Sequence, residues 1–212
     1  MQLRLAKNCD ANVLAEIHKI CGAEQNEGFM FTLGKWFLKK YYQILLNEKN
    51  SVVIVVENEV GNVVGFFSGT IKAEEHIEAI RRCKIRLLLA SLPAIIRRPS
   101  LLSEIYLRYK STGNKGEFVT TSGPRGEYWA CLPGENSIGA FAVHKAWLEV
   151  MRSLGISVAR GEINAMNERS LKAAKLMSAD IVKEIVTPAG QKRYIIEYNL
   201  VEKRDRKVIK KP

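Results

Sequence analysis

Apolar residues alternate with polar ones or recur at helical spacing along most of the chain, and this pattern predicts the first elements. Residues 2–6 alternate, which is typical of a short strand. Apolar residues recur every three or four positions in 11–22, with Asp10 as the expected helix cap, and again in 32–46. The buried face of this second helix is expected to carry Leu33, Trp36, Phe37, Tyr41, Ile44 and Leu45.

A hairpin is predicted next. Residues 51–57 and 62–71 are rich in valine and phenylalanine, and Asn58-Glu-Val-Gly-Asn between them supplies turn residues. Two paired strands are therefore expected immediately after the two helices.

The pattern changes in residues 73–122, which we interpret as a helical insertion. Helical spacing predicts helices around 77–87 and 102–109, with Pro93 and Pro99 as expected interruptions. Between residues 80 and 110 eight residues are basic and one, Glu104, is acidic. Such a stretch fits a membrane surface, an anionic substrate pocket, or a solvated insertion whose charges face water.

The remaining pattern completes a single α/β (α+β) domain over residues 1–200, followed by a basic tail at 201–212 that we expect to be frayed. A strand–helix–strand crossover implies one parallel strand pair inside an otherwise largely antiparallel sheet. The predicted elements are strand 127–132, helix 137–154, strand 156–163, helix 170–177 and a hairpin of strands 180–187 and 191–200 around the turn Pro188-Ala-Gly190.

Composition changes this picture mainly through the net charge of +11, which favours anionic partners. No uncharged apolar run approaches the roughly 20 residues of a membrane-spanning helix. The N-terminus has no apolar signal region, so a cytoplasmic protein is expected. Four scattered cysteines and three isolated histidines argue against a disulfide framework and a metal site. We interpret Cys131 as a small strand hydrophobe rather than a nucleophile.

A loop rich in small residues joins the strand at 127–132 to the following helix, and it is the leading candidate for ligand binding. Residues 133–143 read Pro-Gly-Glu-Asn-Ser-Ile-Gly-Ala-Phe-Ala-Val. Unpaired N–H groups and the helix dipole would attract the phosphate of a cofactor there. Alternatively, Gly139 and Ala140 only allow close helix packing, and Asn136 or Ser137 only caps the helix.

The order of elements and three local sequences resemble the GNAT superfamily of N-acetyltransferases, which transfer an acetyl group from acetyl-CoA to an amine. Gly61-Asn-Val-Val-Gly-Phe-Phe-Ser-Gly resembles the family's third strand. Cys131-Leu-Pro133 and Asn136-Ser-Ile-Gly139-Ala140 resemble the end of the fourth strand and the pyrophosphate loop. Asn167-Glu-Arg-Ser170-Leu-Lys-Ala-Ala-Lys-Leu-Met177 resembles the asparagine and helix that follow the fifth strand.

The resemblance implies a GNAT-type mixed, mostly antiparallel central sheet flanked by helices, and acetyl-CoA (coenzyme A) as the cofactor. The backbone N–H of Cys131 or Leu132 would polarise the thioester, and Asn167 would hold the pantetheine arm. The loop departs from the family pattern at Asn136 and Phe141. The cofactor-binding residues implied are Cys131, Leu132, Pro133, Asn136, Ser137, Ile138, Gly139, Ala140, Phe141 and Asn167.

Two catalytic residues are implied. Glu127, four residues before Cys131, would be the general base, directly or through water, unless it is only an exposed strand carboxylate. A tyrosine commonly stands seven residues after the asparagine and protonates the thiolate, but here that position is Ala174. Ser170 is the nearest hydroxyl that could replace it, or the thiolate leaves unprotonated.

The expected acceptor is a primary amine, and arginines of the insertion would suit a phosphorylated or nucleotide-linked amino sugar. The alternative is a catalytically silent acyl-CoA-binding or regulatory module, which the absent tyrosine favours. Nucleic-acid binding ranks low because no reader motif is present, while peripheral membrane contact through the insertion and a homodimer stay open. The arginines concerned are Arg81, Arg82, Arg86, Arg97 and Arg98.

Overall fold

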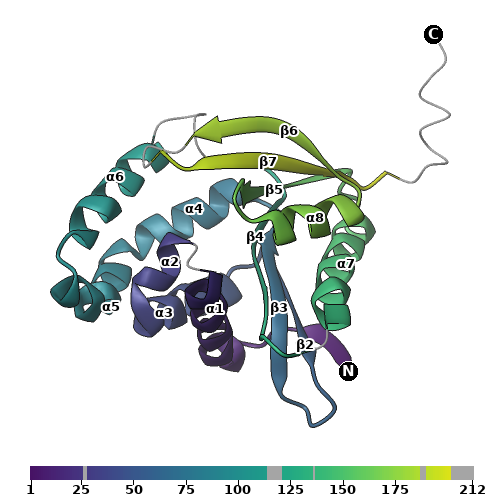
Figure 1. Ribbon diagram of the computed structural model, residues 1–212, viewed down its shortest axis with the longest axis horizontal. Helices are drawn as coiled ribbons and strands as arrows, with labels where there is room; N and C mark the ends of the chain where they lie inside the picture. Colours follow the sequence, from purple (N-terminus) through teal and green to yellow (C-terminus); the bar gives the residue numbers. More distant parts are fainter. Residues whose placement is uncertain (26–27, 114–120, 136, 187–189, 202–212) are drawn as a thin grey trace.

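A seven-stranded sheet forms the centre of the computed structural model, in the order β1-β2-β3-β4-β5-β7-β6 (Figure 1). The structure describes residues 1–25, 28–113, 121–135, 137–186 and 190–201. The strands are β1 (Gln2–Leu5), β2 (Ser51–Glu57), β3 (Val63–Thr70), β4 (Arg125–Cys131), β5 (Val158–Asn164), β6 (Ala179–Val186) and β7 (Lys192–Asn199). The helices are η1 (Asn8–Asp10), α1 (Ala11–Gln25), α2 (Phe29–Thr32), α3 (Gly34–Leu46), α4 (Ala73–Arg82), α5 (Lys84–Arg97), α6 (Leu101–Gly113), α7 (Ser137–Ser153) and α8 (Glu168–Leu176).

The strand pairing confirms the mixed, mostly antiparallel sheet. Among the described strands only β4 and β5 pair in parallel, and α7 forms the crossover between them. This parallel pair has a single registered position, Arg125 opposite Arg160. By contrast, β3 pairs with β4 from Gly65 to Thr70. Strands β4 and β5 therefore meet at one end and separate beyond it.

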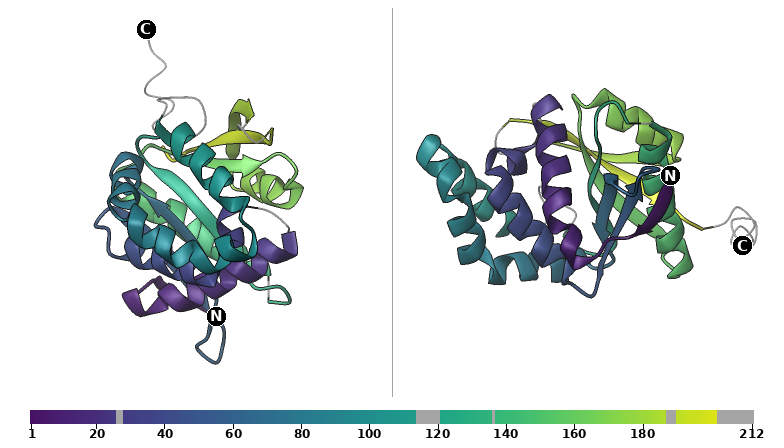
Figure 2. Two further views of the ribbon diagram at one scale, coloured as in Figure 1. Left: turned by 90° about the vertical axis from the view of Figure 1, so that its left-hand side faces the viewer. Right: turned by 90° about the horizontal axis from the view of Figure 1, so that it is seen from below.

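Helices cover both faces of the sheet, α1 and α3 on one side and α7 on the other (Figures 1 and 2). Along β2, Val53 and Val55 pack in the cluster with α1 and α3. Ile54 and Val56 pack in the cluster with α7. A strand buried on both faces needs apolar residues at every position, which explains the uninterrupted valine-rich sequence of this hairpin.

The insertion is helical and contains α4, α5 and α6, but the helix predicted around 77–87 is divided at Cys83 between α4 and α5. Helix α4 begins directly after β3, α5 packs on α3 and α4, and α6 lies at the end of the molecule opposite α7 (Figure 1). Pro99 separates α5 from α6, but Pro93 lies inside α5, where its exposed position tolerates the loss of one helical hydrogen bond. No helix in the described part of the chain is long and apolar enough to cross a bilayer.

Two side chains differ from the sequence pattern. Trp36 of α3 is 68% exposed, although the spacing places it on the buried face. Asp10 is expected to cap α1, but its carboxylate accepts the N–H of Lys7 at 2.6 Å and pairs with Arg4 at 2.7 Å. The buried face of α3 is formed by Leu38, Tyr41, Tyr42 and Leu45. The tail from residue 202 and the expected turn at 188–189 lie outside the described residues.

Two histidines are buried between the helices and the sheet. His18 of α1 stacks on Tyr128 with a centroid separation of 3.5 Å, and its Nδ1 lies 2.7 Å from the hydroxyl of Tyr42. His144 of α7 has no hydrogen-bond partner for either ring nitrogen among the described residues. Burial lowers the pKa of His18 to about 3 and that of His144 to about 4. The rings around His144 are Phe67, Trp129 and Tyr198.

Acidification below about pH 6.5 should therefore destabilise the fold. The unfolded chain gains a proton at each of these histidines that the folded chain does not bind until the pH approaches the lowered pKa. The free energy of unfolding should fall by about 1.4 kcal/mol per pH unit for each histidine. The His144→Phe variant puts an apolar ring among aromatic rings. Its free energy of unfolding should therefore depend less on pH, by the contribution of one histidine. Urea unfolding from pH 7.5 to about pH 4.5 measures it, and an unchanged slope would contradict a neutral His144.

Candidate active site

Strand β4 contains a bulge next to the point where it separates from β5. Ser68 of β3 pairs with Tyr128, but the next residue, Gly69, pairs with Gly126, so Glu127 is an extra residue on β4. Bulges redirect side chains and are frequent beside active sites. We take the gap that opens here between β4 and β5 as the candidate active site.

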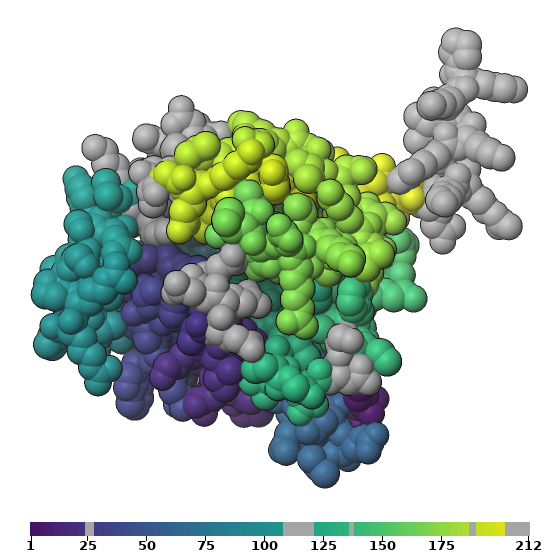
Figure 3. All heavy atoms as spheres, in the orientation of Figure 1, coloured from purple at the N-terminus to yellow at the C-terminus, as the bar shows by residue number. Residues whose placement is uncertain are grey.

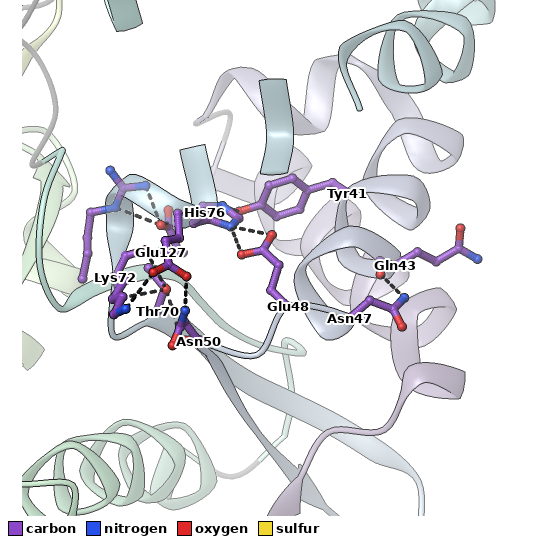
Figure 4. Close-up of polar contacts among 11 residues, drawn as sticks. Tyr41, Gln43, Asn47, Glu48, Asn50, Thr70, Lys72, His76 and Glu127 are labelled. Atoms are coloured by element: carbon purple, nitrogen blue, oxygen red, sulfur yellow. Dashed lines mark hydrogen bonds and ion pairs between the residues drawn. The ribbon is translucent and has the colours of Figure 1, made fainter. Parts of the chain in front are cut away.

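Glu127 is surrounded by polar side chains from several elements (Figure 4). Its Oε1 accepts hydrogen bonds from Nε (2.8 Å) and Nη2 (2.5 Å) of Arg125. The same oxygen lies 3.9 Å from Nε2 of His76 on α4, and the hydroxyl of Tyr41 lies 3.4 Å from that nitrogen. On the other side of the ring, Nδ1 of His76 is 3.0 Å from each carboxylate oxygen of Glu48. A histidine between two carboxylates can pass a proton from one to the other.

The start of α4 is held against the sheet, and this positions His76. The hydroxyl of Thr70 donates to the carbonyl of Asn50 at 3.1 Å, and Nζ of Lys72 lies 2.7 Å from Oε1 of Glu75 (Figure 4). The amide of Asn50 also donates to Glu75. Because His76 is the next residue, these contacts help to place its Nε2 3.9 Å from the carboxylate of Glu127 on β4.

The charges of the site are buried, and their pKa values reflect it. Burial alone would lower the pKa of Arg125, but the carboxylate of Glu127 outweighs it and raises this pKa, so the guanidinium stays charged. On β5, burial raises the pKa of Glu162 although Arg193 donates to it at 3.3 Å. Burial also raises the pKa of Tyr41 well above its ordinary range. Two carboxyl groups in different environments thus lie on the two separating strands, an arrangement suited to proton transfer.

Only one of the two N–H groups expected to polarise a thioester points away from β3. The N–H of Leu132 donates to the carbonyl of Val64 on β3 at 2.8 Å. Because N–H groups alternate between the edges of a strand, that of Cys131 points toward the gap. The carbonyl of Cys131, on the same edge, accepts a hydrogen bond from the thiol of Cys21 at 3.2 Å. Burial raises the pKa of the Cys131 thiol, which agrees with a hydrophobic rather than a nucleophilic role.

The loop after β4 leads directly into α7, as the pattern predicts. Pro133 is exposed, and Ser137 is the first residue of α7. Ile138 in the first helical turn is exposed to solvent. Asn136, predicted to contact the cofactor, lies outside the described residues. The helix start therefore reaches solvent, which leaves room for an anion.

The next residues of α7 face the interior. A Cβ atom at Gly139 would meet only the flexible end of the Met1 side chain, because the nearest atoms of Val56 on β2 lie at an ordinary contact distance of 3.5 Å. The indole N–H of Trp129 donates to the carbonyl of Ala140 at 2.9 Å. The ring of Phe141 packs against Trp129 with centroids 6.2 Å apart. Phe141 thus packs against Trp129 of β4 and does not crowd the loop between β4 and α7.

Asn167 and Ser170 lie at the start of α8, after β5. The side-chain oxygen of Asn167 accepts the N–H of Ser170 at 2.9 Å and caps the helix. Ala174, where the family's tyrosine commonly stands, is buried one turn after Ser170. In the described contacts, the hydroxyl of Ser170 reaches neither Glu127 nor Cys131.

Sequence reasoning missed four residues of this site: Glu48, His76, Arg125 and Glu162. His76 and Glu48 are 28 residues apart and no local motif links them, so only the packing of α4 brings them together. Arg125 and Glu127 did carry a signal. Opposite charges two positions apart on a buried strand point to one face and can pair there.

Comparison with known proteins relies on solved structures, because no protein-family model and no curated protein matches the chain. The ribosomal-protein-alanine N-acetyltransferase from Brucella melitensis superposes with a TM-score of 0.60 at 14% identity, over 94% of this chain and 99% of that one. Aminoglycoside 6'-acetyltransferase type Ii gives 0.60 at 6% identity, over 96% and 99%. NAA60 from Arabidopsis thaliana, in complex with acetyl-CoA, gives 0.56 at 14% identity, over 93% and 97%.

These matches span nearly the whole chain at very low identity, so they identify the architecture rather than the substrate. The element order, the one parallel strand pair and these superpositions agree: the chain has the fold of the GNAT-type acetyltransferases.

Proposed function

We propose that this protein is an acetyl-CoA-dependent N-acetyltransferase that transfers the acetyl group directly to a primary amine. The observation that carries the proposal is the gap between β4 and β5, which opens beside the Glu127 bulge. A thioester bound in this gap would lie against the edge of β4 that is not paired with β5. The carboxylate of Glu127 comes from the same strand. The likeness in fold to acetyltransferase structures with acetyl-CoA supports this choice.

Three parts of the chain would hold acetyl-CoA. The N–H of Cys131 would bind the thioester oxygen, since it points to the gap. The start of α7 would present the positive end of a 17-residue helix to the diphosphate, and the side chain of Ile138 is exposed there. Asn167 at the start of α8 would hold the pantetheine arm. The residues present therefore fit the cofactor, although the N–H of Leu132 is taken up by the carbonyl of Val64.

The proton of the attacking amine would pass to Glu127, directly or through a water molecule. Arg125 holds one oxygen of this carboxylate and keeps it in place. His76, with Nδ1 bound by Glu48, would carry the proton onward. The insertion would thus supply a residue to the chemistry through the first turn of α4.

The leaving group is the CoA thiolate. Acetyl-CoA supplies an activated acetyl group; the C–N bond forms as the C–S bond breaks, and the N–H of Cys131 would stabilise negative charge on the acetyl oxygen. Ser170 would donate a proton to the sulfur if the helix moves closer. Otherwise the thiolate leaves as such, because a thiol pKa near 8.5 makes it a good leaving group.

The acceptor would carry a negative group, as in a phosphorylated or nucleotide-linked amino sugar. The net charge of +11 and the arginines of the insertion support this class. The arginines concerned lie exposed on or next to α4 and α5: Arg81, Arg82, Arg86, Arg97 and Arg98. Arg81→Ala together with Arg82→Ala should therefore raise the KM for a phosphorylated amine and leave kcat nearly unchanged. An unchanged KM would remove the anionic acceptor and leave the N-acetyltransferase proposal intact.

A catalytically silent acyl-CoA-binding module is the second candidate. The buried Ala174 in place of a tyrosine favours it. The engagement of Glu127 by Arg125 favours it as well, because the ion pair already occupies one oxygen of the carboxylate. Activity separates the two candidates, whereas binding of acetyl-CoA does not.

Acetyl-CoA binding should raise the stability of the protein. At about 100 times its dissociation constant the ligand should add roughly 2.7 kcal/mol to the free energy of unfolding. Ile138→Asp, which puts a carboxylate at the exposed start of α7, should abolish most of this gain by repelling the diphosphate. Leu154→Asp, an exposed site at the other end of the helix, is the matched control. No thermal shift for the wild-type protein would remove acetyl-CoA from the proposal.

Glu127→Gln should lower kcat by about 10²- to 10⁴-fold, because the amide still accepts from Arg125 but cannot take a proton. Initial rates with acetyl-CoA and a panel of primary amines measure this, and thermal unfolding checks the fold. Glu184→Gln, on the half-exposed side chain that pairs with Lys192 on the neighbouring strand, is the control and should keep full activity. Full activity of Glu127→Gln would exclude Glu127 as the base. No turnover by the wild-type protein with any amine would favour the silent module.

A further inference from the structure

Helix α5 has an apolar face that the rest of the described chain leaves exposed. Leu87, Ser91 and Ile95 form its buried face against the protein. A second apolar set follows at intervals of three or four residues, which places it on one side of the helix. Its members, which we call the α5 stripe, are Ile85 (67% exposed), Leu88 (43%), Leu89 (59%), Leu92 (42%) and Ile96 (77%). A helix that is apolar on two faces but buried on only one has a surface suited to a partner.

The neighbouring elements enlarge this apolar end of the molecule. Leu102, Tyr106 and Leu107 of α6 are more than half exposed. Between α3 and α5 lies a hollow of about 360 Å³ that includes the exposed Trp36 and Leu89 and is bordered by Lys39 and Lys40. Helices α5 and α6 form the left-hand end in Figures 1 and 3 and lie toward the viewer in the left panel of Figure 2.

Positive charge surrounds the α5 stripe. Helix α5 contains three basic residues and no acidic residue. Glu104, the one acidic residue between residues 80 and 110, already pairs with Arg98 at 2.6 Å. The exposed basic residues beside the stripe are Arg81, Arg82, Lys84, Arg86, Arg97 and Arg98.

This combination of charge and apolar surface decides between occupants. A second copy would bring the same positive charges against each other, which costs free energy. A nucleic acid would use the charges but leave five large aliphatic side chains in water. A bilayer with anionic lipids uses both, because the aliphatic side chains enter the acyl boundary while arginine and lysine reach the head groups. Exposed tryptophan and tyrosine also favour the membrane interface.

We propose that the α5 stripe, with its basic border and the exposed side chains of α6, is a docking surface for bilayers that contain anionic lipids. Binding is peripheral, since no described helix can cross a bilayer. The first turn of the same insertion carries His76 of the candidate active site, so α4 connects the docking surface to the chemistry. Helix α4 has 10 residues, a length of roughly 15 Å.

Vesicle co-sedimentation of the full chain tests the proposal. The protein should bind vesicles of equal parts phosphatidylcholine and phosphatidylglycerol, and bind pure phosphatidylcholine at least tenfold more weakly. The triple variant Ile85→Gln, Leu89→Gln and Ile96→Gln should weaken binding to the anionic vesicles at least tenfold. Replacing Lys84 and Arg86 with glutamine should weaken binding about fivefold per charge.

The matched control replaces three exposed apolar residues elsewhere: Val60→Gln, Met166→Gln and Leu176→Gln, at positions 78%, 82% and 66% exposed. It should bind anionic vesicles like the wild-type protein. Thermal unfolding checks that both triple variants fold, and both should keep wild-type binding of acetyl-CoA. Equal binding of the stripe variant and the wild-type protein would overturn the proposal. So would a wild-type dimer that ignores vesicles and dissociates in the stripe variant, or wild-type binding to random DNA but not to vesicles.

Discussion

The separation of β4 from β5 is the constraint on which the candidate site depends. Strand β4 follows β3 along its length but meets β5 only where Arg125 lies opposite Arg160. Packing on both faces holds β4 in this course: Tyr128 stacks on His18 of α1, and Trp129 bonds to the backbone of α7. Because β4 is bound from three sides, the gap toward β5 is a property of the fold and needs no ligand to open it.

Buried charges concentrate at this gap. Glu127 pairs with Arg125, His76 with Glu48, and Glu162 with Arg193. A buried ion pair costs about as much in desolvation as it returns in attraction, so such pairs are weak evidence for stability. Their accumulation beside a bulge supports the proton transfer that we propose for Glu127. The insertion then has two ends with different tasks: its first turn completes the charged site, and α5 and α6 present an apolar, basic surface.

The sequence pattern predicted the elements well where both faces of an element have a simple partner. The β2–β3 hairpin, the β4–α7–β5 crossover and the closing hairpin all lie within a few residues of their predicted positions. The sequence pattern did not predict which residues are buried where a helix has more than one apolar face. Trp36 belongs to an apolar surface that the core does not use, and Pro93 is tolerated because it lies on the exposed side of α5. Periodicity reports that a face is apolar but not what covers it.

The sequence by itself determined the order of strands and helices, the parallel pair, the small-residue loop into α7 and the position of Glu127 beside it, because local spacing and chain connectivity fix these features. Only the tertiary structure decided which groups surround Glu127. His76 and Glu48 come from an insertion and the end of a helix, and their meeting depends on how α4 and α3 pack on the sheet. The same packing buries one face of α5 and leaves the other in solvent, which no count of apolar residues along the chain could reveal.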